Sequence, residues 1–281
     1  MSAMRSHRGR LWLAAGGIAS VLLWSSPSVW AESYTYQGHT LKYAVPPGYC
    51  LMDRQGVVGS AFYSLIEKGL QDDEEFVAVY LNCDELATFM GTHTSPLLHG
   101  GVIAIPKSGG SIDVRGDETR RDEINHQVDK FSTIDLGWVN AQLKLRGEER
   151  GVVVSELKDL RLVDHDNIAA YAMFMDAKDD QHMPMISVMA LSLTNQLPFR
   201  NVMIAPASDP NVVQTLLDGQ HRYMTWLIAQ NETEEQRNQQ SQPTPGLLSG
   251  SSSLGSGSLA IGALCFFGAL WLLIRVLHSR A

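Results

Sequence analysis

Cysteine is scarce in this chain of 281 residues, which contains three: Cys50, Cys83 and Cys265. Cys265 lies inside a long apolar run near the C-terminus, so Cys50 and Cys83 are the only pair available to the preceding part of the chain. There is no C-x-x-C motif and no basic cluster beside either residue, which argues against a redox or metal pair. Both residues follow strand-like segments. The terminal segments described below predict an exported domain, in which such a pair usually bonds, so we predict a Cys50–Cys83 disulfide.

The short motifs of common enzyme classes are also missing. The sequence has no G-x-S-x-G nucleophile elbow and no G-x-x-x-x-G-K-[ST] phosphate loop. Its histidines show neither H-x-x-x-H nor H-E-x-x-H spacing. These absences favour a non-enzymatic role with no cofactor. The alternative is a hydrolase-type enzyme whose His, Asp and Glu residues are dispersed along the chain, because spacing does not reveal such a site.

Basic residues are fewer than acidic residues. The chain carries 22 basic and 30 acidic residues, a net charge of −8. Five arginines lie in the two terminal segments described next, which leaves 17 basic against 30 acidic residues, a net charge of −13, for residues 32–274. A body of that charge is repelled by nucleic acid and by anionic lipid, so nucleic-acid binding is excluded as a function class.

The N-terminal segment has the layout of a secretory signal peptide. Arg5, Arg8 and Arg10 precede an apolar stretch at 11–23, and in "VWA" (29–31) Val29 and Ala31 occupy the positions where signal peptidase requires small residues. We therefore predict a signal peptide over 1–31, with cleavage after Ala31. The apolar stretch is short for a segment that must cross about 30 Å of hydrocarbon, although an uncleaved signal anchor is the alternative.

The C-terminal segment predicts a membrane anchor. Residues 259–274 are uncharged and predict a single transmembrane helix, and the arginines in the 275–281 tail place that tail in the cytosol. The polar, Ser/Gly/Gln-rich stretch 232–258 predicts a flexible linker. The expected location is the inner membrane of a bacterium, with the bulk of the chain in the periplasm. The segment also resembles bacterial C-terminal sorting tails of the GlyGly type, although "GSGS" replaces the Gly-Gly pair.

The exported domain, residues 32–231, alternates between the periods of strands and helices. Its first part predicts two short strands within 34–50, further strands at 76–83 and 101–105, and helices at 57–70, from 84, and at 117–132. A final amphipathic helix is predicted at 211–230.

Four strands are predicted in the second half, at 152–164, 168–175, 185–194 and 199–205. Short, turn-prone connections predict an antiparallel meander. The second and third strands are apolar at odd and even positions alike, which requires cover on both faces of the sheet. The predicted fold class is therefore α+β, an antiparallel sheet with helices on both faces, plus the single C-terminal transmembrane helix.

The opening "GHTLKYAVPPGY" (38–49), the late meander at 152–205 and the closing helix at 211–230 resemble the layout of the Mog1/PsbP-like fold. The resemblance covers most of the exported domain. It implies a largely non-catalytic family of assembly factors, binding modules and envelope lipoproteins. No functional residue is carried over, because no diagnostic motif accompanies the layout.

Two stretches carry candidate chemistry. In "DHDN" (164–167), two aspartates and His165 could ligate a cation or orient a base, although Asp and Asn there are typical of a hairpin turn. The stretch 171–189 holds soft ligands suited to Cu(I), with Met189 at its end. In a hairpin, Met173 and Met175 would lie on the same face as Met183 and Met185 if the numbers of two directly paired residues add to an even total. Core packing is the other interpretation of these methionines. The candidate ligands are Met173, Met175, His182, Met183 and Met185.

The sequence thus predicts a membrane-tethered, non-enzymatic periplasmic domain for partner binding or envelope assembly. Its expected partners are the membrane, through the C-terminal helix, and another envelope protein. The alternatives are the dispersed-site hydrolase and a soft-metal protein that uses the 173–189 hairpin.

Overall fold

The computed structural model describes residues 32–56, 59–60, 63–64, 74–92, 95–108, 110–150, 155–176 and 184–244. The predicted signal peptide, the predicted membrane span with its tail, and most of the helix predicted at 57–70 lie outside the described residues. Within the described ranges, no helix combines the length and the apolar character needed to cross a bilayer.

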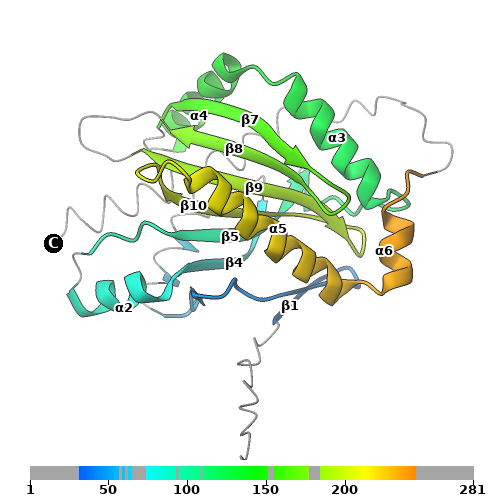
Figure 1. Ribbon diagram of the computed structural model, residues 1–281, viewed down its shortest axis with the longest axis horizontal. Coiled ribbons are helices and arrows are strands. Elements are labelled where there is room, and N and C mark those ends of the chain that lie inside the picture. The colour runs from blue at the N-terminus through cyan, green and yellow to red at the C-terminus, as the bar shows by residue number, and fades with distance from the viewer. Residues whose placement is uncertain are drawn as a thin grey trace, which may run out of the picture. The chain divides into compact units, whose positions relative to one another are not determined.

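An antiparallel sheet forms the centre of the fold (Figure 1). The strand order is β3-β4-β5-β10-β9-β8-β7, and short β6 pairs with β5. The strands are β3 (Tyr49–Leu51), β4 (Glu74–Asn82), β5 (Gly100–Ser108), β6 (Ser111–Ile112), β7 (Leu157–His165), β8 (Ala170–Asp176), β9 (Met185–Thr194) and β10 (Leu197–Pro206). The predicted meander is confirmed, because β7, β8, β9 and β10 are neighbours in sequence and in the sheet. The strand predicted from 152 begins at Leu157.

Helices cover both faces of this sheet, so the α+β prediction is confirmed for the described part of the chain. One core contains Phe89 of α2 (Cys83–Thr92), Phe131 of α3 (Arg120–Ser132) and Leu143 of α4 (Leu136–Arg150). The other core contains Leu216 and Met224 of α5 (Val212–Asn231), which contacts β9 and β10. β9 is buried along its full length, as its continuous apolar run requires.

A separate hairpin lies beside the α5 core. β1 (Glu32–Tyr36) and β2 (His39–Tyr43) pair antiparallel across a two-residue turn, and Leu41 of β2 is fully buried in that core. Gln37 and Gly38 in this turn have positive φ, as have Asn195 and Gln196 in the β9–β10 turn. Both two-residue turns thus have the backbone that follows the natural twist of a hairpin.

Two helices were not predicted. α4 carries a thin apolar stripe, with Val139 and Leu143 one turn apart, and its long polar surface hides the period. α6 (Glu234–Gln240) lies inside the stretch predicted as a flexible linker and buries none of its side chains. It begins with a capping box in which the Thr233 side chain and the Gln236 side chain satisfy each other's backbone N–H groups. The described fold therefore continues to Thr244.

Candidate functional site

The structure separates the methionines that the sequence grouped as a Cu(I) site. In the pairing of β8 with β9, the numbers of two directly paired residues add to an odd total, as for Met173 and Val188. This register places odd-numbered residues of the two strands on opposite faces of the sheet. Met173 and Met175 lie on the α5 side of the sheet, whereas Met185 packs in the core that contains α3 and α4. Their thioethers fill two different cores. His182 and Met183 lie outside the described residues.

The "DHDN" stretch ends β7 with Asp164 and His165 and begins the turn to β8 with Asp166 and Asn167. In the structure it is contacted by a histidine that the sequence did not connect to it. The His221 ring of α5 has Nδ1 3.1 Å from Asp166 Oδ2 and Nε2 3.1 Å from Asp164 Oδ2. The two ring nitrogens point in opposite directions, so these three groups do not converge on one cation. Asp166 also accepts from the backbone N–H groups of Ile168 and Ala169, as a turn aspartate does.

This cluster lacks an activated nucleophile. The hydroxyl in contact with it belongs to Tyr171, which donates to Asp166 Oδ2 at 3.4 Å. Burial raises the pKa of Tyr171, and the neighbouring Asp166 carboxylate raises it further. The phenol therefore stays protonated and donates a hydrogen bond to Asp166, the carboxylate that also contacts His221.

A groove with a volume of about 500 Å³ opens where the β1–β2 turn, the β9–β10 turn and α6 meet. Its lining is rich in side-chain amides, and we call it the carboxamide groove. The lining residues are Asn195, Gln196, Gln236, Gln239 and Gln240, with Gly38, His39, Thr40 and Glu232. None of these residues belongs to a motif that would mark a site in the sequence.

Hydrogen bonds between the two hairpin turns preform one wall of the groove. His39 Nδ1 donates to the Asn195 carbonyl at 3.0 Å, since a carbonyl oxygen can only accept. In return the Asn195 side-chain amide donates to the Thr40 carbonyl at 2.8 Å. These bonds join segments that lie more than 150 positions apart in the chain.

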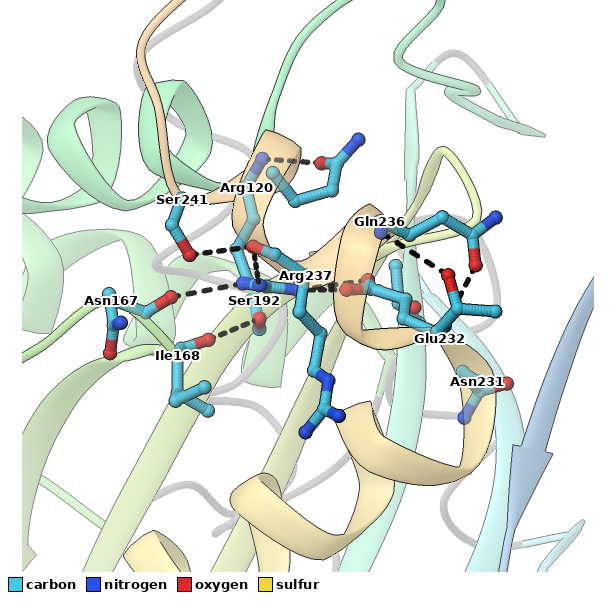
Figure 2. Close-up of polar contacts among 12 residues, drawn as sticks. Arg120, Asn167, Ile168, Ser192, Asn231, Glu232, Gln236, Arg237 and Ser241 are labelled. Atoms are coloured by element: carbon cyan, nitrogen blue, oxygen red, sulfur yellow. Dashed lines mark hydrogen bonds and ion pairs between the residues drawn. The ribbon is translucent and has the colours of Figure 1, made fainter.

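The opposite wall is held by a buried ion pair. Figure 2 shows the Arg120 side chain running between Asn167 on one side and Glu232 on the other. Its NH1 group donates to both Glu232 carboxylate oxygens, at 2.9 and 2.7 Å, and its NH2 group donates to the Arg237 carbonyl at 3.4 Å. Arg120 is fully buried and Glu232 is 6 % exposed. The pair therefore fixes the start of α3 against the α5–α6 junction and the last turn of α6.

Further polar contacts fix the end of the described chain. The Arg120 backbone N–H donates to Gln240 Oε1 at 2.8 Å, and Thr244 donates to the Asp122 carboxylate through its backbone N–H and its hydroxyl. Burial raises the pKa of Asp122, but hydrogen bonds from Thr244 and Thr119 outweigh burial and lower it overall. These contacts place Thr244, the last described residue, at the N-terminal end of α3.

The groove carries almost no net charge. Glu232 is its only acidic lining residue. The Glu232 carboxylate accepts hydrogen bonds from the Arg120 guanidinium and from the Thr194 hydroxyl, which lies 2.7 Å from Glu232 Oε1. What the groove presents to a ligand is therefore a set of neutral hydrogen-bond donors and acceptors.

Other buried charges lie away from the groove, on the sheet face covered by α3. Arg200 NH1 lies 2.5 Å from Glu74 Oε1, and both side chains are almost fully buried. Burial lowers the pKa of Lys130 on α3 to about 8, although Glu123 acts in the opposite direction. Gln127 donates to Glu123 at 2.6 Å. Lys130 is partly buried and the other four side chains are buried, and none of them lines the carboxamide groove.

In the part of the chain that the structure describes, no three His, Cys, Asp or Glu side chains are placed to hold a metal ion. Cys50 and Cys83 lie at disulfide-bonding distance, with Cα atoms 5.1 Å apart, as the sequence predicted. The pair ties β3 to the start of α2.

No protein-family model matches this chain, and a search of curated proteins finds no significant relative either.

Proposed function

We propose that this chain is a membrane-tethered, non-enzymatic domain of the bacterial periplasm that binds another envelope protein in the carboxamide groove. The predicted signal peptide and the predicted span at 259–274 support the location. The layout shared with the Mog1/PsbP-like fold, a largely non-catalytic family, supports a binding role.

The observation that carries the proposal is the position of the groove next to the predicted tether. One wall of the groove is α6, and the contacts of Thr244 with Asp122 fix the point where the tether would begin. A coil over residues 245–258 has a root-mean-square span of about 20 Å by square-root scaling. A partner bound in the groove would accordingly be held close to the outer face of the inner membrane.

The His221 cluster does not support a hydrolase to the same degree. The His221 ring is partly buried, and Asp164 and Asp166 each contact one of its two nitrogens. No serine or cysteine side chain donates to His221 in the described residues.

Two measurements test the proposal. The full-length chain should fractionate with inner membranes, and protease added to intact spheroplasts should digest the described domain. A photo-cross-linking amino acid at Gln239, in the groove, should give a discrete adduct with an envelope protein, whereas the same group at Gln214, exposed on α5, should not. Recovery of the chain in the aqueous fraction, or equal adducts at both positions, would contradict the proposal.

A further inference from the structure

The free hydrogen-bonding groups of the carboxamide groove are of both kinds. Gln236 Oε1 and Gln240 Oε1 are occupied by the backbone N–H groups of Thr233 and Arg120, which leaves both side-chain NH₂ groups to donate. The side-chain amides of Gln196 and Gln239 make no hydrogen bond to another described side chain or backbone group. Each of these amides offers two donors and an acceptor. The groove is therefore equipped to satisfy a ligand that presents donors and acceptors together.

The charge of the groove and the residue types that line it indicate which class of ligand it could bind. The Glu232 carboxylate is already neutralised by Arg120, so a charged ligand group would lose its hydration without gaining a counter-ion. The lining contains no Trp, Tyr or Phe, and its one ring, the His39 imidazole, is held at Nδ1 by the Asn195 carbonyl, so the groove offers little surface for stacking a nucleobase or a sugar. These two features together favour a neutral ligand held mainly by hydrogen bonds.

An extended peptide backbone has this pattern of groups. Every residue other than proline presents one N–H and one C=O, which a carboxamide can match with its own acceptor and donors. α6 spans Glu234–Gln240, about 10 Å at 1.5 Å per residue, which is the length of about three extended residues. We infer that the carboxamide groove binds a short, extended, uncharged peptide segment of the partner by its backbone amides. This inference rests on the proposed function and names the chemistry of its ligand.

The exposed sheet edge is a poorer place for the same peptide. β7 is the terminal strand at one edge, while the other edge ends in the three-residue strand β3. Two irregularities interrupt the pairing register of β7, between Leu157 and Asp159 and between Leu162 and Asp164. Lys158 and Arg161 add charge along this strand. Bulges and charges are the features that prevent strand addition at an edge.

The test uses the full-length chain in lipid nanodiscs and capped fluorescent hexapeptides as probes. One set is neutral and polar, built from Ser, Gly, Asn and Gln, and matched sets are acidic, basic or N-methylated at alternate backbone amides. Chitooligosaccharides form a separate arm. The neutral set should bind best, and N-methylation should weaken its binding at least about tenfold, because each lost amide hydrogen bond contributes on the order of 1 kcal/mol.

A double variant ties the binding to the groove. Gln239→Ala removes one free amide, and Gln196→Gly removes another while it creates an Asn-Gly pair at two positions of positive φ, the preferred sequence for this turn. The fold is thereby spared, and affinity for the neutral set should fall about tenfold. Gln242→Ala, an exposed glutamine outside the groove, is the matched control and should bind normally.

Three results would overturn the inference: no binding of the neutral set, equal binding of its N-methylated form, or preference for chitooligosaccharides. If the adduct at Gln239 persists while the peptides fail, the proposed function stands and only the peptide chemistry is lost. If neither the adduct at Gln239 nor peptide binding is observed, both the proposed function and the peptide inference are contradicted.

Discussion

The buried pair of Arg120 and Glu232 offers the most direct test of how the groove wall is built. Glu232→Gln keeps the shape of the side chain but removes its charge, and the Arg120 guanidinium is then left fully buried without a counter-ion. The carbonyls of Asn167 and Arg237 still accept from it, yet neither carries charge. Breaking a buried pair in this way costs about 3–5 kcal/mol, a large share of the 5–15 kcal/mol that stabilises an ordinary domain.

Urea unfolding followed by circular dichroism measures this loss, and limited proteolysis between residues 233 and 244 reports whether α6 detaches first. The double variant Arg120→Met, Glu232→Leu should recover at least about 2 kcal/mol of the loss, because no charge is then left unpaired. Asp159→Asn is the matched control: its ion pair with Arg161 is exposed, and its removal should cost less than about 1 kcal/mol. A Glu232→Gln variant as stable as the control would refute the reasoning.

Three further predictions concern stability. Replacing Cys50 and Cys83 by alanine should lower the free energy of unfolding by about 4 kcal/mol for their sequence separation of 33, and unchanged urea midpoints would count against this. Burial raises the pKa of Glu85, but hydrogen bonds from the His99 side chain and backbone outweigh burial and lower that pKa below 4.5. Glu85 therefore stabilises the fold above about pH 4.5, and this contribution is lost as the pH falls further. Glu85→Gln should flatten the acid limb of a plot of stability against pH, and an unaltered limb would exclude this role. Burial lowers the pKa of Lys130 from 10.5 to about 8, so stability should rise between those pH values; Lys130→Met should remove that rise and stabilise the chain at pH 7, as pH-dependent urea titrations would reveal.

Local patterns predicted most of the elements because the forces that form them are local. The apolar runs of β8 and β9 and the turn residues between neighbouring strands predicted the meander and its two covered faces. The helix expected at 117–132 starts at Arg120, because Thr119 caps it. α4 was not predicted because few of its positions are apolar. α6 was not predicted either, but the capping box formed by Thr233 and Gln236 is a sequence pattern that indicates the start of a helix.

Contacts between distant segments were beyond such patterns. The sequence predicted a hairpin at 171–189, but a change of register by one residue moves every side chain to the other face, and only packing of the whole sheet decides the register. In the same way, "DHDN" shows two aspartates and a turn, whereas the meeting with His221, which is 57 positions from Asp164, depends on where α5 crosses the sheet.

The amino-acid sequence by itself determined the strands of the meander, the disulfide pairing and the α+β class, since period, turn chemistry and cysteine count are properties of short stretches or of simple totals. The tertiary structure alone decided which turns meet, which carboxylate neutralises Arg120 and where the amides of α6 gather into a groove. Those outcomes follow from the packing of two cores on one sheet, to which residues far apart in the chain contribute together.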